Sequence, residues 1–101
     1  MEVTFDFDAE LFEWDARDDA SWVFVQLPVE VADEIRDLAP SVGGFGSVKV
    51  AVACGSSEWR TSVFPDKGSG SYVLPLKKAV RRAQSLEPGD VGQFSLSLVV
   101  A

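Results

Sequence analysis

Apolar and polar residues alternate strictly over the first eleven positions of the chain. The apolar residues occupy the odd positions from Val3 to Leu11, and mainly acidic side chains stand between them. A period of two predicts an amphipathic β-strand that packs one face on a core. After Leu11 the phase changes, because Phe12 and Trp14 occupy even positions. This change predicts a β-bulge that bends a long strand around a small barrel.

Five later segments are rich in β-branched and aromatic residues and are separated by turn-forming residues. This composition predicts further strands. They cover residues 22–27, 47–54, 58–64, 71–74 and 91–100. Gly55 to Ser57 lies between the second and third of these segments and predicts a hairpin turn there.

Two stretches carry apolar residues at helical spacing, and each follows a Leu-Pro pair. We expect one helix to begin at Pro28 and to end at Pro40, and another to be opened by Pro75. The first helix is predicted to bury one face and to expose an acidic one, formed by Glu30, Asp33, Glu34 and Asp37. In the second helix the predicted inward residues are Leu76, Ala79, Val80 and Ala83, and the predicted outer face is basic, with Lys77, Lys78, Arg81 and Arg82.

The order of elements repeats along the chain. Each half runs through a strand, a Leu-Pro pair, a short helix, a turn that contains proline, and another strand. We therefore predict a mainly β fold with a pseudo-two-fold repeat. It is a small closed or nearly closed barrel of about six strands with two short helices, and it forms a single domain over residues 1–101.

The region between the two halves carries a pattern that extends over nearly the whole chain. Its elements are Trp59-Arg60-Thr61-Ser62, Pro65, Gly68, Gly70, Leu74-Pro75, Val80-Arg81 and Gly89-Asp90, with Trp22 to Pro28 and Gly43 to Gly46 before them. In these residues the chain resembles the Domain of unknown function 1905 family. The resemblance implies a compact β-barrel with short helices, and it implies no activity.

A second resemblance is confined to residues 74–91. A strand, a Leu-Pro pair, a short helix with Val80-Arg81 and a Gly-Asp turn are similar to the AbrB-type swapped-hairpin DNA-binding regulators. In this chain the segment between Pro75 and Gly89 is about two residues longer, and two barrel-like halves are present. This resemblance implies a related barrel architecture.

The composition excludes several kinds of chemistry. The chain has no histidine and a single cysteine, Cys54. Zinc sites built on histidine, catalytic triads and paired-cysteine sites are therefore ruled out, and we expect no metal and no cofactor. The first residues lack the basic segment of a signal peptide, and no apolar run reaches the roughly 20 residues of a membrane span. We therefore expect a cytoplasmic protein without a membrane partner.

Charge is distributed unevenly along the chain. The net charge is −7, but residues 1–40 hold twelve acidic and two basic side chains, and residues 41–101 hold four acidic and seven basic ones. The overall sign disfavours nucleic acid as a partner, because affinity for nucleic acid comes mainly from neutralising phosphates. The net charge does not exclude a local basic surface formed by residues 41–101.

One candidate site combines the third predicted strand with the glycine-rich loop that follows it. Arg60, with Thr61 and Ser62 beside it, offers a planar fork that suits a carboxylate or a phosphate. Lys67 and the backbone amides of Gly68 and Gly70 would close over the same anion. The alternative is that Arg60 pairs with a structural carboxylate such as Asp90, and that the loop is only flexible.

The basic helix is the second candidate. Lys77 and Lys78 lie at the start of the helix, where positive charge opposes the helix dipole, and Arg81 follows on the same basic face. An anion bound at the helix N-terminus would explain this arrangement. A solvated charged face explains the same residues. The acidic and basic helices are also complementary, which predicts a homodimer held by them in a salt-sensitive way.

Three functions follow from these patterns. The preferred one is a non-catalytic barrel that binds a small anionic ligand or a protein partner through the surface from Arg60 to Gly70. The second is an AbrB-like nucleic-acid-binding regulator that uses the helix from Lys77 to Arg82. The third is an enzyme, which would require Asp66 or Asp90 to act with Arg60.

Overall fold

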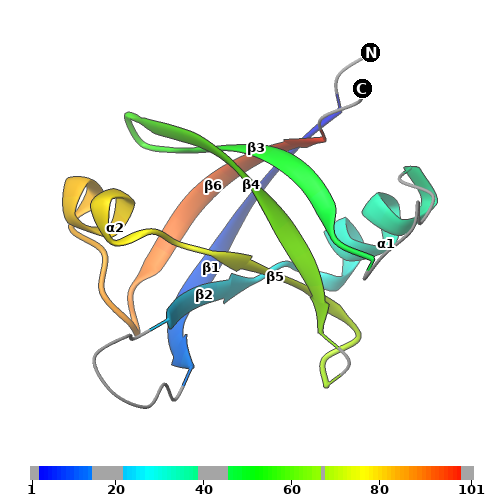
Figure 1. Cartoon of the computed structure of the whole chain (residues 1–101), viewed down its shortest axis with the longest axis horizontal. Helices are drawn as coiled ribbons and strands as arrows, with labels where there is room; N and C mark the ends of the chain where they lie inside the picture. The colour runs from blue at the N-terminus through cyan, green and yellow to red at the C-terminus, as the bar shows by residue number, and fades with distance from the viewer. Residues whose placement is uncertain (1–2, 15–21, 39–45, 67, 99–101) are drawn as a thin grey trace.

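The computed structural model describes residues 3–14, 22–38, 46–66 and 68–98 (Figure 1). Within them the strands form a closed barrel with the order β1-β2-β5-β4-β3-β6, and every neighbouring pair is antiparallel. The predicted fold class, a six-stranded barrel with two short helices, is confirmed. The elements are β1 (Thr4–Trp14), β2 (Trp22–Gln26), α1 (Val29–Leu38), β3 (Val48–Cys54), β4 (Ser57–Asp66), β5 (Ser71–Pro75), α2 (Lys78–Gln84) and β6 (Val91–Leu98).

The apolar residues predicted to face inward fill the barrel. Alternate positions of the strands contribute the fully buried side chains, and α1 adds Ile35 and Ala32. The largest fully buried apolar side chains are Leu11, Leu27, Ile35, Leu74, Leu96, Val23, Val25, Val50 and Val63. Packing of this kind is what a small barrel requires, because its interior is just wide enough for side chains to fill.

The predicted bulge in β1 is wrong. β1 pairs with β6 in one constant register from Thr4 to Glu10 and contains no extra residue. The extra residue lies opposite β1: the Leu11 N–H donates to the Asp90 carbonyl at 2.8 Å, and the Gly89 N–H donates to the Leu11 carbonyl at 2.7 Å, so Gly89 and Asp90 together oppose Leu11. At Leu11 the strand also acquires a second partner, β2. The Phe12 side chain therefore points outward, like those of the other even positions. The change in the sequence pattern results from an apolar outer surface at this place.

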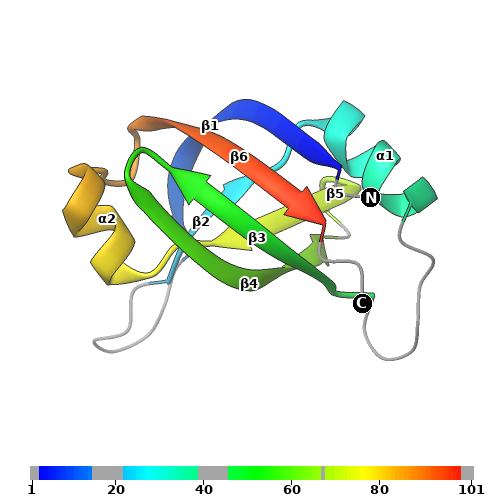
Figure 2. The ribbon, with the colours of Figure 1, turned by 90° about the horizontal axis from the view of Figure 1, so that it is seen from above.

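The pseudo-two-fold relation is visible in the strand order. Replacing β1, β2 and β3 by β4, β5 and β6 reverses the circular order of the barrel, as a two-fold axis across it would. Two equivalent hydrogen bonds flank the β2–β5 ladder: the Leu27 N–H donates to Tyr72, and the Leu76 N–H donates to Val23, both at 2.9 Å. Each half then sends its helix to its own end of the barrel (Figures 1 and 2).

The second helix begins later than predicted. Pro28 directly precedes α1, whereas Pro75 is still in β5 opposite Phe24, and α2 begins only at Lys78. The reason is the hydrogen bond from Leu76 to β2, which keeps the chain extended past the proline. Of the predicted inward positions within α2, only Val80 is buried, and Ala79 and Ala83 are exposed.

The β3–β4 hairpin has a loop of two residues, and its first residue requires glycine. Cys54 pairs with Ser57, and Gly55 has a φ of 59°. A Cβ at Gly55 would also lie 2.0 Å from Oε1 of Gln84, whose amide donates to the Ser57 hydroxyl at 3.0 Å. The hairpin tip is thereby attached to α2.

Gly55→Ala is expected to lower the free energy of unfolding by about 1–3 kcal/mol, through positive-φ strain and displacement of Gln84. The change is measured by urea unfolding. Gly70→Ala is the matched control, because Gly70 also has a positive φ, 73°, but an added Cβ there meets no atom within 4 Å. Equal losses in the two variants would show that the contact with Gln84 contributes nothing.

Candidate functional site

The barrel has a polar outer face where β4, β3, β6 and the first part of β1 lie side by side. The registers place Arg60 opposite Ala51, and Ala51 opposite Ser97. One row along, Glu58 lies opposite Ala53, which lies opposite Ser95. Long charged side chains on β4 therefore adjoin two rows of small side chains on β3 and β6.

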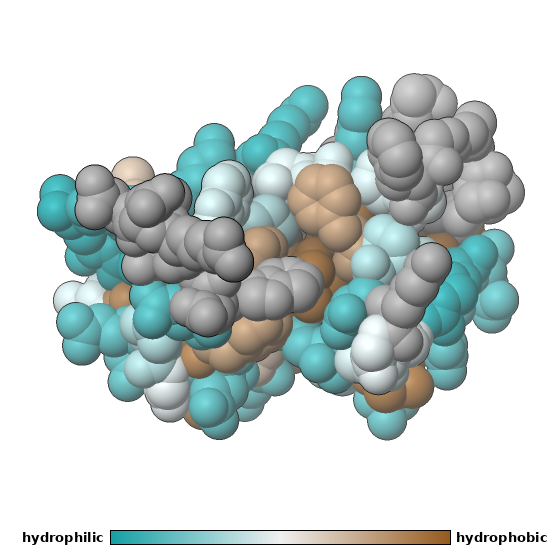
Figure 3. Space-filling view, turned by 60° about the horizontal axis from the view of Figure 1, so that its bottom comes forward, coloured by the Kyte–Doolittle hydropathy of each residue, from teal (hydrophilic) through white to brown (hydrophobic). Residues whose placement is uncertain are grey.

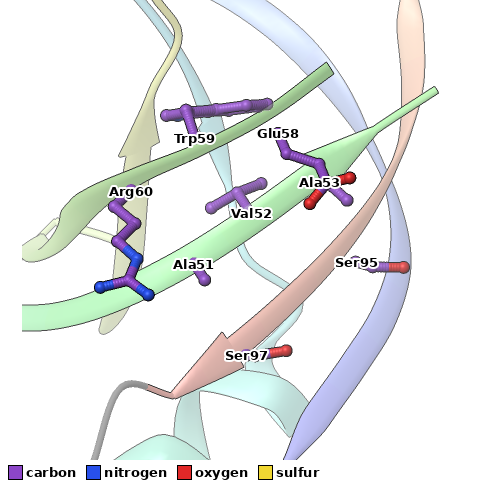
Figure 4. A pocket seen from close by; sticks show the side chains of 8 residues that line it. All are labelled: Ala51, Val52, Ala53, Glu58, Trp59, Arg60, Ser95 and Ser97. Carbon is purple, nitrogen blue, oxygen red and sulfur yellow. The ribbon is translucent and has the colours of Figure 1, made fainter. Parts of the chain in front are cut away.

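A hollow of about 430 Å³ lies on this face. Figure 4 shows Arg60 and Glu58 reaching across β3, with the guanidinium beside Ala51 and the carboxylate beside Ala53. The two alanines leave room for this, since larger side chains there would fill the space. The lining residues are Ala51, Val52, Ala53, Glu58, Trp59, Arg60, Ser95 and Ser97.

The far side of the hollow is fixed to β1 by side-chain hydrogen bonds. The Ser95 hydroxyl donates to the Asp6 carboxylate. Ser97 and Thr4 share a hydrogen bond of 2.8 Å between their hydroxyl groups. The floor is therefore held by strand pairing and by side chains, and such support positions a binding surface well.

Arg60 is exposed and has no ion pair within the described ranges, where the one recorded pair is Arg36 with Asp33. The alternative that Arg60 pairs with Asp90 is wrong. The Asp90 carboxylate accepts the Glu87 N–H at 2.9 Å and closes the turn before β6. Seven positions of β6 separate that turn from Ser97, roughly 20 Å of extended chain.

The glycine-rich loop does not join Arg60. Six positions of β4 separate Arg60 from Asp66, which again corresponds to roughly 20 Å. The loop is instead closed by Asp66, whose carboxylate accepts the Gly68 N–H at 3.3 Å and the Ser69 hydroxyl at 2.8 Å. The Gly70 N–H donates to the Asp66 carbonyl at 2.9 Å. Lys67 lies outside the described residues.

The neighbours of Arg60 on its own strand divide between the two faces. Thr61 has the inward direction of Val63, is partly buried, and is not among the residues that line the hollow. Ser62 shares the outer face with Arg60, but it lies opposite Lys49, beyond the edge of the hollow. Of the predicted strand triplet, only Arg60 belongs to this surface.

Arg36 has a role that sequence reasoning missed. From α1 it donates to the Asp33 carboxylate at 2.8 Å and to the Gly70 carbonyl, and its guanidinium lies 5.7 Å from the centre of the Tyr72 ring. It thereby attaches the glycine-rich loop to α1. The sequence places Arg36 on an acidic helix and gives no indication of these partners, which come from the other half of the chain.

The basic helix borders a second hollow, of about 420 Å³. Its lining residues are Lys78, Arg81, Arg82, Ser85, Leu86 and Glu87. Lys77 is the N-cap residue, in an extended conformation, and its side chain makes no capping hydrogen bond. Arg81 is half-buried, and its Nε has no partner within the described part of the chain. The predicted cations therefore gather around one helix, and none of them lines the Arg60 hollow.

Comparison with known families identifies the chain. The model of the Domain of unknown function (DUF1905) family matches residues 7–96, which include all six strands in whole or in part. The chain belongs to the DUF1905 family. The predicted family is thus confirmed, and the AbrB-type resemblance stays a prediction. No curated protein matches the chain.

The DUF1905 barrel also has an apolar outer face, formed by the end of β1 with β2, β5 and the end of β4. Phe12 stacks on Phe24 at 6.0 Å between ring centres, and Phe24 stacks on Trp22 at 6.4 Å. Trp22 is 59% exposed and Phe64 is 44% exposed. Figure 3 shows hydrophobic surface in the middle of this side of the molecule. It explains Phe12, which interrupted the pattern of β1.

The residues that a catalytic interpretation of the DUF1905 domain would use can be located in the structure. Burial raises the pKa of the Cys54 thiol, which makes it a poor nucleophile. The carboxylates of Asp66 and Asp90 close turns that lie away from Arg60. Across the described residues, no three acidic or cysteine side chains are grouped as metal ligands. No helix within these ranges is both long and apolar enough to cross a membrane.

Proposed function

We propose that this DUF1905 domain is a non-catalytic binding module that holds a small anionic ligand on Arg60. The observation that carries the proposal is the position of the guanidinium, exposed and beside a hollow with a floor of alanine and serine. Arginine presents a rigid fork of donors that matches a carboxylate or a phosphate with two parallel hydrogen bonds. A volume of about 430 Å³ suits a ligand the size of a metabolite.

Glu58 restricts the kind of anion. Its carboxylate lies over the same hollow, two positions from Arg60 on the same face of β4. A ligand with several negative groups would be repelled there, because like charges at this spacing oppose each other. We therefore favour a ligand with one anionic group for Arg60 and a hydrogen-bond donor, such as a hydroxyl or an amine, for Glu58.

The absence of a recognisable catalytic set supports binding over catalysis. The sequence contains no histidine, and its one cysteine is buried. Arg60 is roughly 20 Å of strand from both predicted carboxylate partners. A cytoplasmic location, suggested by the single cysteine, belongs to the same proposal.

A thermal-shift screen tests the proposal. The probes are inorganic phosphate, acetate, lactate, succinate and glycerol phosphate. A probe at 100 times its dissociation constant adds about 2.7 kcal/mol, so the melting temperature is expected to rise by several degrees in a domain of this size. Arg60→Ala is expected to abolish the shift.

Lys49→Ala is the matched control. It removes one positive charge from the same outer face, and Lys49 lies outside the hollow. It is expected to retain the shift. Loss of the thermal shift in both variants would show that the shift depends only on general surface charge. A thermal shift that Arg60→Ala retains would rule out the Arg60 site.

The hollow beside α2 supports a second candidate, the nucleic-acid-binding regulator. It brings Lys78, Arg81 and Arg82 together without an acidic residue in the helix. The net charge of −7 opposes this function. Adding short oligonucleotides to the thermal-shift screen tests this second candidate. A shift that they alone produce, and that Lys78→Ala/Arg82→Ala abolishes, would favour the regulator.

A further inference from the structure

The two helices lie at opposite ends of the molecule and carry opposite charge. Figures 1 and 2 both place α2 at one end of the barrel and α1 at the other, along a longest dimension of 34 Å. The exposed acidic residues of α1 are Glu30, Asp33, Glu34 and Asp37. The basic residues at the other end are Lys77, Lys78, Arg81 and Arg82. A helix at one end cannot reach the helix at the other end of the same chain.

The charges on each helix are only partly neutralised locally, by Arg36 beside Asp33 on α1 and by Glu87 in the hollow that borders α2. On α1 the one basic residue, Arg36, is directed to Asp33, Gly70 and Tyr72. On α2 there is no acidic residue. Each chain therefore presents an acidic end and a basic end.

The two helix faces match in spacing. Glu30 and Glu34 on α1 are four positions apart, as are Lys78 and Arg82 on α2. Residues at this spacing are neighbours on a helix surface, about 6 Å apart. Two acidic groups of one chain can therefore meet two basic groups of another at the same time.

Apolar surface accompanies the charges at both ends. Val29 and Leu38, the first and last residues of α1, are 52% and 51% exposed. On α2 the exposed residues beside Lys78 and Arg82 are Ala79 and Ala83. Their small side chains let a second helix approach closely, and a contact with an apolar component is stronger than an ion pair alone.

From this complementarity we propose that the protein associates with further copies of itself, with α1 of one chain against α2 of the next. The contact joins two different surfaces, so each addition leaves one acidic end and one basic end unused. The assembly therefore grows head to tail unless the rotation between successive copies closes it into a ring. The Arg60 hollow lies on the side of the barrel and stays accessible in every copy.

Sedimentation velocity over a range of protein concentrations tests this proposal. At about 10 mM salt, where charges act over about 30 Å, the average mass is expected to rise with concentration past that of a dimer. At about 1 M salt, where they act over about 3 Å, the monomer is expected throughout. A monomer at low salt and the highest soluble concentration would overturn the proposal.

Charge-reversal variants identify the surfaces. Glu30→Lys/Glu34→Lys and Lys78→Glu/Arg82→Glu are each expected to weaken association at least about tenfold, since each places like charges in contact. A mixture of the two variants is expected to associate, because the unchanged α2 of the first meets the unchanged α1 of the second. Circular dichroism confirms that both fold.

Two results would contradict the assignment. One is unchanged association of both charge-reversal variants, which would show that the copies meet at another surface, for example the apolar outer face. The other is a mixture that stays monomeric although the wild-type protein associates. Arg60→Ala is expected to associate normally, so a failure of the ligand proposal is distinguishable from a failure of this one.

Discussion

Leu74→Ala is expected to lower the free energy of unfolding by about 3–5 kcal/mol. Leu74 is completely buried and lies opposite Val25 at the centre of the β2–β5 ladder. This ladder connects the two pseudo-equivalent halves, so a cavity there weakens packing from both sides. Removing a buried leucine costs the transfer of its methyl groups and the cavity that remains. The loss is a large part of the about 5–15 kcal/mol that stabilises a domain of this kind.

Urea unfolding monitored by tryptophan fluorescence measures the change. Leu38→Ala is the control, because it removes the same atoms from a helical position that is 51% exposed. It is expected to cost less than about 1 kcal/mol. Similar midpoints for the two variants would mean that the side chain of Leu74 is not enclosed by the barrel.

Ala51→Leu is expected to weaken ligand binding at the Arg60 hollow about a hundredfold, which corresponds to about 2.7 kcal/mol. Ala51 lies directly opposite Arg60 on the outer face. A leucine there occupies the hollow and displaces the guanidinium that reaches across β3 (Figure 4). The side chain points outward, so the barrel interior is unchanged and the fold is expected to remain stable.

Isothermal titration with the probe that gives the largest thermal shift measures this loss. Ala79→Leu makes the same change at an exposed position of α2, away from the hollow, and is expected to bind normally. Unchanged affinity in Ala51→Leu would place the ligand outside the hollow even if Arg60 were required for binding.

The barrel itself could be predicted from the sequence because its interior is encoded by alternation. Odd positions of β1 and the even positions of β3 and β6 point inward, and each segment shows this period on its own. The same rule failed where the outer surface is apolar. Phe12 produced an apparent change of phase in the alternation of apolar and polar residues, although its side chain packs on Phe24 of the neighbouring strand.

The start of α2 could not be predicted for a related reason. Pro75 is as well suited to a helix start as Pro28, and local sequence cannot reveal that Leu76 still bonds to β2. Tertiary hydrogen bonding decided the boundary. Leu76 is buried in the extended segment before the helix, and within α2 the buried residue is Val80.

Arg60 was recognisable as a candidate from its side chain and its strand, but its surroundings were not. The hollow combines Ala51, Glu58 and Ser97, which come from three strands, and only the registers bring them together. The glycine-rich loop appeared adjacent because it follows the same strand. Strand length carries it to the other end of β4, where Asp66 and Arg36 hold it.

An NMR titration of the isotopically labelled protein with inorganic phosphate and with lactate tests the central claim most directly. Backbone amide shifts locate binding residue by residue, including weak binding. The expected result is that the largest changes fall on residues 51–53, 58–60 and 95–97. Changes confined to residues 78–87, or the absence of any saturable change, would contradict an anion site at Arg60.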